Sequence, residues 1–327
     1  MSAVVCFGEA LIDFLAAPES APDAPRAYLR NAGGAPANVA VALARLGVAS
    51  RFVGMLGADL FGDFLAAELA AAGVDTRGVR RTAEAKTALA FVDLDAEGER
   101  SFSFYRPPAA DLLFEPAQFD AADFAGCAVF HVCSNSLTAQ PARGATVAGM
   151  RRAREAGALV SMDLNLRTNL WEAGADLHAE VWPALAEAAL VKLSRSEMDW
   201  LAECEGSDAA VLERLLQHRA RLVVVTDGGS GPVTWHAAGS HGAYPVVPVR
   251  AVDTTGAGDA FVAGLLAQLL ARGAGADDLV ALAADAAAMT SLLRFASACG
   301  ARATQSHGAF AAMPTHADVL AFLEQNP

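Results

Sequence analysis

The stretch DTTGAGDAFVAG at residues 253–264 places two glycines and a carboxylate directly before an apolar helical pattern. Gly256 and Gly258 allow a tight backbone turn and let N–H groups approach a ligand closely. A helix N-terminus adds unpaired N–H groups and a partial positive charge. The stretch therefore predicts a site for an anion, such as a transferring phosphoryl group. Asp259 either complements the helix dipole or acts as a general base beside that anion.

Strand-like and helix-like segments alternate along the rest of the chain. Five short apolar runs are typical of strands buried on both faces of a parallel sheet: 3–8, 128–133, 158–163, 189–194 and 221–228. Four segments between them have helical patterns: 36–47, 61–73, 141–157 and 196–206. This alternation predicts an α/β fold, a doubly wound and mainly parallel sheet flanked by helices.

One segment departs from the alternation of strand and helix. Residues 87–106 alternate with period two around the turn-like DAEGE at 95–99, which predicts a β-hairpin. Together with residues 13–30, this hairpin is expected to form a small β-sheet lid beside the main sheet. No linker or repeat divides the chain, so we expect one domain over residues 1–327.

Composition and charge exclude several classes of partner. The chain is 54% hydrophobic, which predicts a sizeable buried core, and its net charge is -13. Because Lys and Arg are scarce, nucleic-acid and anionic-membrane binding are not expected. The N-terminus MSAVVCFGEALIDF has no basic segment, and no apolar run approaches the roughly 18 residues of a membrane span. Five scattered cysteines without CxxC spacing complete the expectation of a cytoplasmic protein with reduced thiols.

Three more glycine- or asparagine-containing loops accompany strand ends or helix starts, at 31–40, 163–171 and 225–232. In α/β sheets, ligands bind beyond the carboxyl ends of the strands, where such loops lie. The P-loop pattern GxxxxGK[ST] is absent, which excludes a P-loop NTPase, and no GxGxxG follows the first strand, which disfavours a Rossmann dehydrogenase.

Two of these segments, GGAPANVAVALARLG at 33–47 and DTTGAGDAFVAG at 253–264, together resemble the signatures of the PfkB (ribokinase-like) carbohydrate kinases. The resemblance extends over nearly the whole chain and is greatest for the fructokinase branch. It implies a ribokinase-like fold and an ATP-dependent phosphotransferase with an alcohol acceptor, which converts D-fructose to fructose 6-phosphate. The alternatives are a 2-keto-3-deoxygluconate kinase, a ribokinase and, from another class, a non-catalytic sugar or nucleotide sensor.

The resemblance also implies roles for individual residues. Asp259 matches the general base that accepts the proton of the attacking hydroxyl, and the anion hole is matched by Gly256, Ala257 and Gly258. The implied sugar site consists of Asp13, Gly33, Gly34, Asn38, Phe104, Arg106 and Arg167. Phe104 stands where the ketodeoxygluconate branch has a tyrosine, and this favours fructose. For Asp13 and Asn38 the structural alternative is turn and cap chemistry, and for the two arginines it is a solvated surface.

ATP and Mg²⁺ are the implied cofactors. The matching positions are Lys192, Ser194, Glu197, Thr226, Gly228, Gly229, Gly231 and Ser297. Glu197 is expected to organise Mg²⁺ through water, because Mg²⁺ retains several waters in most sites. Ser194 and Ser297 each replace a commoner asparagine. A monovalent-cation site matches Asp253, Thr255, Ala303, Ser306 and Gly308, so K⁺ is a further candidate. The expected partners are a small sugar and a second copy of the chain, bound through the lid.

Overall fold

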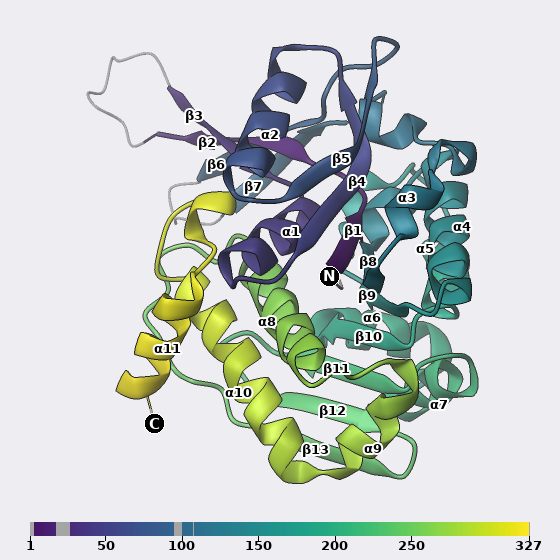
Figure 1. The fold of residues 1–327 in the computed structure, drawn as a ribbon, viewed down its shortest axis with the longest axis vertical. Helices are drawn as coiled ribbons and strands as arrows, with labels where there is room; N and C mark the ends of the chain where they lie inside the picture. The colour runs from purple at the N-terminus through teal and green to yellow at the C-terminus, as the bar shows by residue number, and fades with distance from the viewer. Residues whose placement is uncertain (1–2, 18–26, 95–99, 107, 327) are drawn as a thin grey trace.

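A computed structural model of the chain contains one large twisted sheet, helices on both of its faces, and a small second sheet (Figure 1). The structure describes residues 3–17, 27–94, 100–106 and 108–326. The predicted turn at 95–99 and residues 18–26 of the predicted lid lie outside these ranges. The predicted doubly wound α/β architecture with a small accessory sheet is confirmed.

The large sheet has nine strands among the described residues. In spatial order they are β13 (Ser240–Tyr244), β12 (Val233–Ala237), β11 (Leu222–Thr226), β10 (Leu190–Ser194), β9 (Leu159–Asp163), β8 (Cys127–Cys133), β1 (Ala3–Phe7), β4 (Ser50–Gly57) and β5 (Asp75–Thr82). Neighbours are parallel except β11–β12 and β12–β13. The five predicted strands are all present and parallel, whereas β4, β5, β12 and β13 were not predicted.

Helices cover both faces of this sheet, as Figure 1 shows. One face packs against α1 (Ala35–Arg45), α2 (Leu60–Ala71), α8 (Ala257–Ala271), α9 (Leu279–Ala284), α10 (Ala286–Ala303) and α11 (His316–Gln325). The other packs against α3 (Ala121–Phe124), α4 (Ala142–Glu155), α5 (Leu177–Leu185), α6 (Arg195–Glu205) and α7 (Asp208–Gln217). Successive residues of one strand enter opposite core layers, as Val4 and Val5 do, because side chains alternate across a sheet. This explains the continuous apolar runs.

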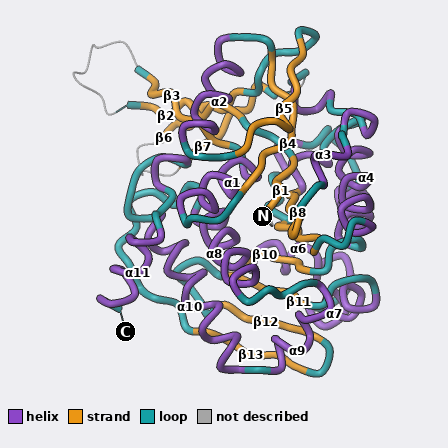
Figure 2. The backbone as a smooth tube through the Cα atoms, in the orientation of Figure 1, coloured by secondary structure: helices purple, strands orange, loops and turns teal. Residues whose placement is uncertain are grey.

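The small sheet, called the lid below, has the strand order β3-β2-β6-β7. Its strands are β3 (Tyr28–Gly33), β2 (Leu11–Ala16), β6 (Leu89–Leu94) and β7 (Arg100–Tyr105). The predicted hairpin is confirmed by the antiparallel pairing of β6 with β7. In Figure 2 the lid lies at the opposite end of the view from β12 and β13. The lid therefore lies near the β4–β5 end of the large sheet.

No single helix among the described residues has both the length and the hydropathy that crossing a bilayer requires. One bent pair, Ala276–Ala284 with Ala286–Ala303, meets that requirement by length and composition only, and its two parts are inclined by 108°.

Candidate active site

The predicted loops from distant parts of the sequence meet at the carboxyl edge of the large sheet. The chain continues from β1 to β4 on one side and later adds β8 on the other, so the strand order reverses at β1. Such a reversal opens a crevice at the carboxyl ends of the strands. Asp163, Ser194 and Thr226 are the last residues of β9, β10 and β11. The site is thus assembled by the sheet itself.

The glycine turn before α8 leaves the start of that helix open. Gly256 has a φ of 73° and precedes the helix, and no side chain within the described ranges caps it. A Cβ at Gly256 would lie 2.6 Å from Met313 Cε. A Cβ at Gly258 would lie 3.4 Å from Lys192 Nζ, so this lysine lies close behind the turn. Ala257 N–H donates to the Thr254 carbonyl at 3.2 Å, so the N–H groups of Gly258 and Asp259 are the ones left for an anion, with a cation close by.

Asp259 is buried in the first turn of α8, at 7% exposure. Its Oδ2 accepts a 2.7 Å hydrogen bond from Asn38 Nδ2. Burial raises the pKa of Asp259 to about 7, and the Asp163 charge adds to this, while the Asn38 bond and the Lys192 and Arg167 charges oppose it. A carboxyl group with a pKa near neutrality can both accept and release a proton under mild conditions.

Asp13 projects from the lid toward the same region as Asp259. Burial raises the pKa of Asp13 to about 7, and the charges of Asp259 and Asp253 add to the effect. Strand register places Asp13 in one row with Asn31 and with Phe104, two strands away, so these side chains share a lid face. A Cβ at Gly33 would lie 2.1 Å from Asp13 Oδ2, so only glycine leaves room for this carboxylate.

The two predicted sugar-site arginines differ in environment. Arg106 is 2% exposed, and its guanidinium donates to Asp111 Oδ2 at 2.9 and 2.5 Å and to Thr138 Oγ1 at 3.2 Å. The solvated alternative therefore does not hold for Arg106. Arg167 is exposed, but its charge lowers the pKa of both Asp13 and Asp259. Arg167 is the more available of the two for a mobile ligand.

The predicted nucleotide loop follows β11 and is open. Gly228 has a φ of 53°, and a Cβ at Gly228 or Gly229 would meet no atom of the described chain within 4 Å. A Cβ at Gly231 would lie 2.4 Å from Asp227 Oδ2. On α10, Ser297 is 9% exposed, and its Oγ has no hydrogen-bond partner among the described residues. A buried unpartnered hydroxyl favours a ligand contact at this position.

Ser194, Glu197 and Lys192 already have partners within the protein. Glu197 N–H donates to Ser194 Oγ at 3.2 Å, and Ser194 N–H donates to Glu197 Oε2 at 2.7 Å. Glu197 Oε1 accepts from the backbone N–H of Leu166 at 2.7 Å. Lys192 Nζ lies 3.1 Å from the Asp163 carboxylate; burial would lower the pKa of Lys192, but the Asp163 and Glu197 charges outweigh it and raise that pKa. Lys192 therefore remains a cation.

The residues of the predicted cation site lie together between the turn before α8 and the loop after α10. Asp253 is 2% exposed, and its carboxylate accepts from Thr255 N–H at 2.7 Å and from Gly308 N–H at 3.0 Å. Ser306 N–H donates to the Ala303 carbonyl at 3.3 Å. Residues 55 positions apart in sequence are thus hydrogen-bonded to each other, as a shared site requires.

Sequence reasoning missed four polar residues of this region. They are Glu9, Asp111, Asn135 and Asp163, all buried. The rule that ligands gather at strand ends could have indicated two of them, because Glu9 follows the apolar run of β1 and Asp163 ends that of β9. The other two lie on short 3-10 turns, η1 (Ala110–Leu113) and η3 (Ser134–Leu137), which have no periodic pattern.

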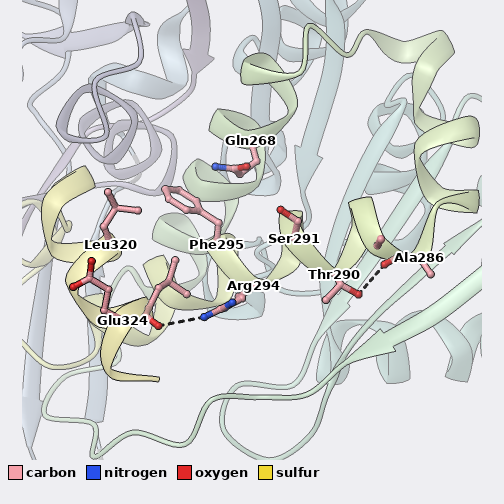
Figure 3. A pocket seen from close by; sticks show the side chains of 10 residues that line it. Gln268, Ala286, Thr290, Ser291, Arg294, Phe295, Leu320 and Glu324 are labelled. Carbon is pink, nitrogen blue, oxygen red and sulfur yellow. Dashed lines mark hydrogen bonds between the residues drawn. The ribbon is translucent and has the colours of Figure 1, made fainter. Parts of the chain in front are cut away.

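A separate groove of about 970 Å³ lies between α8, α10 and α11 (Figure 3). Gln268, Thr290, Arg294 and Leu320 are among the residues that line it, and Arg294 Nη2 donates to the Leu323 carbonyl at 3.2 Å. None of the predicted site residues lines this groove. It is therefore distinct from the candidate active site.

Comparisons with known proteins identify the family of this chain. The family described as pfkB family carbohydrate kinase matches residues 1–316. Fructokinase-1 of Zea mays is 43% identical over 324 residues, which cover 98% of this chain and 98% of that protein. A fructokinase structure with bound ATP from Xylella fastidiosa is 50% identical, covers 99% of this chain and 98% of its own, and has a TM-score of 0.94.

A double mutant of fructokinase from Vibrio cholerae O395, solved in a fructose-, ADP- and potassium-bound form, is 35% identical with a TM-score of 0.85. The match covers 99% of this chain and 98% of that one. Family match and relatives thus extend over nearly the full length, and the site geometry fits the same chemistry. The chain belongs to the pfkB family of carbohydrate kinases.

Proposed function

We propose that this protein is an ATP-dependent fructokinase, which transfers the γ-phosphoryl group of ATP to the 6-hydroxyl of D-fructose. The observation that carries the proposal is the pairing of a buried carboxyl, Asp259, with the uncapped first turn of α8. A base and an anion site in the same helical turn suit the transfer of a phosphoryl group to an alcohol. The full-length fructokinase relatives support fructose as the acceptor.

Asp259 is the proposed base. Above its pKa of about 7 the carboxylate is ionised and accepts the proton of the attacking sugar hydroxyl. Asn38 holds one oxygen of this carboxylate through its Nδ2. The Asn38 Oδ1 is buried and has no partner in the described chain, so it can accept a hydrogen bond from a second sugar hydroxyl. Asn38 would thereby align the sugar with the base.

The open turn before α8 is the proposed cradle for the transferring group. When bound, ATP with Mg²⁺ supplies the phosphoryl group and part of the charge neutralisation. The N–H groups of Gly258 and Asp259 and the nearby ammonium of Lys192 would hold negative charge at the point where it develops. Ser297 Oγ and the open glycine loop after β11 fit a nucleotide on the other side of the turn.

We propose that phosphate oxygens and water supply most of the ligands of Mg²⁺. No group of three or more His, Cys, Asp and Glu side chains in the described ranges has the arrangement of a metal site. Both Glu197 oxygens accept backbone N–H groups. Their remaining lone pairs can accept from water, but the carboxylate cannot turn both oxygens onto one Mg²⁺ without losing these bonds. This fits the water-mediated role that the sequence predicts for Glu197.

We also propose activation by K⁺ at Asp253 and Thr255. The buried Asp253 carboxylate lies directly before the glycine turn, so a cation there would order the N–H groups of the turn. The potassium-bound fructokinase relative supports the proposal. Replacing Na⁺ with K⁺ at constant ionic strength should raise kcat. Equal rates in Na⁺, K⁺ and a large organic cation would contradict it.

A sugar panel tests the substrate. Fructose should give the highest kcat/KM in a coupled ADP-release assay with ribose, ketodeoxygluconate, mannose and glucose. The apolar Phe104 on the sugar-facing row of the lid favours fructose over a sugar acid. A tenfold preference for ketodeoxygluconate or ribose would overturn the assignment within the family. Absence of turnover with every sugar, together with measurable sugar binding, would favour the sensor alternative.

The lid is the proposed contact between two copies of the chain. Two of its large hydrophobic side chains are well exposed, Leu29 at 58% and Tyr105 at 67%. Covering such residues is favourable because apolar surface leaves water. Light scattering of the purified protein should give twice the chain mass of 33.7 kDa. Leu29→Arg should shift that mass toward the monomer. A monomeric mass for the wild type as well as for Leu29→Arg would contradict the proposal.

A further inference from the structure

The segments that join the lid to the body are held by buried polar contacts. One of these segments contains Thr87, whose N–H and Oγ1 donate to Asp59 at 2.9 and 2.8 Å. Gly57 N–H donates back to Thr87 Oγ1 at 3.2 Å. Another contains Arg106, which is held by Asp111 and Thr138. These contacts fix the position of the lid but do not reach the catalytic base.

Glu9 differs from these anchors because it joins two segments at once. It follows β1, where the chain first enters the lid, and it is 1% exposed. Its Oε1 accepts from Ala35 N–H at 3.0 Å, where the chain returns from the lid into α1. The same oxygen accepts from Asn135 Nδ2 at 2.9 Å, which ties both segments to η3 of the body. Burial raises the pKa of Glu9, although the Arg106 charge and the Asn135 hydrogen bond oppose this, so a carboxylate here is costly and points to a purpose beyond packing.

Helix α1 carries the effect of Glu9 toward the base. Ala35 is the first residue of α1, and a Cβ at Gly34, just before it, would lie 2.6 Å from the Glu9 carbonyl oxygen. One turn later, Asn38 N–H donates to the Gly34 carbonyl at 2.7 Å. The Asn38 side chain then donates to Asp259. Because a helix turn is stiff, a shift at Ala35 moves the Asn38 amide relative to the carboxylate.

We propose that Glu9 is a positioning residue for the transfer reaction, which holds the start of α1 so that Asn38 aligns Asp259. The contact acts locally, where the chain leaves β1 and where it enters α1, and not through the Thr87 anchor of the lid. The inference rests on Asp259 as the base. Glu9 itself touches neither the anion turn nor Asp259, so its action is indirect.

Two conservative variants of Glu9 separate the effect of the position of its carboxylate from the effect of its charge. Glu9→Asp keeps the negative charge but is one methylene shorter, so its carboxylate cannot keep both contacts. Glu9→Gln keeps an acceptor oxygen at the same reach and loses the charge. We expect Glu9→Asp to lower kcat about tenfold, because a displacement of about 1 Å in a catalytic group is costly. Glu9→Gln should retain kcat within about threefold of wild type, because its amide oxygen can still accept the same two hydrogen bonds.

The pH profile provides a readout that a purely structural role would not change. The Asn38 hydrogen bond lowers the pKa of Asp259, so loosening it raises that pKa. The acid limb of kcat should therefore move to higher pH in Glu9→Asp, by roughly half a unit. The charged groups that act on Asp259 are unchanged in this variant: Asp163, Lys192 and Arg167, together with Asp13 from the lid. The charge of residue 9 is also unchanged.

Thr87→Val is the matched control, because it removes an anchor of the lid that does not reach α1. Its melting temperature should fall, while its kcat and acid limb should match wild type. If Glu9→Asp behaves like Thr87→Val, or if Glu9→Gln loses as much kcat as Glu9→Asp, the positioning role is overturned. Asp259→Asn, measured in parallel, keeps the two assignments apart. Normal turnover in that variant would overturn the base, whereas its loss beside an unaffected Glu9→Asp would overturn only the inference.

Discussion

Helices α6 and α8 begin at the same edge of the sheet, and they differ in whether side chains cap their first turns. The start of α6 is closed by a capping box, in which Ser194 and Glu197 each accept the other's backbone N–H. The start of α8 has Gly256 in the left-handed region and no side-chain cap in the described chain. A capped start stabilises its helix by about 1 kcal/mol. The uncapped start forgoes this stabilisation and leaves the N–H groups of Gly258 and Asp259 for an anion, while Ala257 N–H donates to the Thr254 carbonyl.

The largest expected effect comes from Asp259→Asn in the open helix. Asparagine preserves the size of the side chain and can still bond Asn38, but it cannot accept a proton. We expect kcat to fall by roughly 10²–10⁴, the usual contribution of a general base. Calorimetric affinity for the sugar should persist. Turnover within about fivefold of wild type would leave Asp259 as a helix-start residue like those of α6.

Gly256→Ala should close the open start by a different route. A side chain at a φ of 73° is strained, and its Cβ would lie 2.6 Å from Met313 Cε. We expect kcat to fall about 10- to 100-fold through displaced N–H groups. Gly273→Ala is the control, at the other end of α8, with a φ of 64° and no described atom within 4 Å of its Cβ. The strained φ should lower the free energy of unfolding of Gly273→Ala by about 1–2 kcal/mol, and its kcat should equal that of wild type.

Proton uptake by the buried carboxyls should couple activity to pH. The pKa values of Asp259 and Asp13 are raised to about 7, so kcat should fall by about tenfold per pH unit below that value. The folded state binds these protons more tightly than the unfolded chain, whose carboxyls titrate near pH 4. Their ionisation therefore lowers stability as pH rises from about 4 to 7. Asp259→Asn should raise the melting temperature more at pH 8 than at pH 5, and the reverse order would contradict the assigned shift.

The smallest effect is expected at the closed helix. Ser194→Ala removes the cap of α6 and should lower the free energy of unfolding by about 1 kcal/mol. Because the Ser194 hydroxyl is engaged with Glu197, kcat should stay within about twofold of wild type. A melting curve and one kinetic series decide this. A rise in KM for ATP without loss of stability would instead assign Ser194 to the nucleotide, as the sequence resemblance implies.

Local patterns predicted much of the fold and part of the site. The apolar runs indicated β1 and β8–β11 because both faces of these strands are buried. Strand β5, with the sequence DTRGVRRT, lies at the sheet edge and has no apolar run, so its pattern was not recognised. Glycine turns indicated the anion site, since a left-handed backbone leaves a sequence signal. Glu9 has no glycine signal of this kind; only its place at the carboxyl end of β1 marks it, and a strand end alone does not distinguish a buried acid from a solvated one.

The sequence by itself determined that residues 253–264 form an open helix start and that the strands around it are parallel. Both follow from local properties, the conformational freedom of glycine and the periodicity of apolar side chains. Only the tertiary structure decided that Asn38 bonds Asp259 across 221 positions and that Lys192 lies behind Gly258. It also decided the burial that raises the pKa of Asp259 to about 7. These properties depend on which groups surround a carboxylate in space, and no local pattern contains that information.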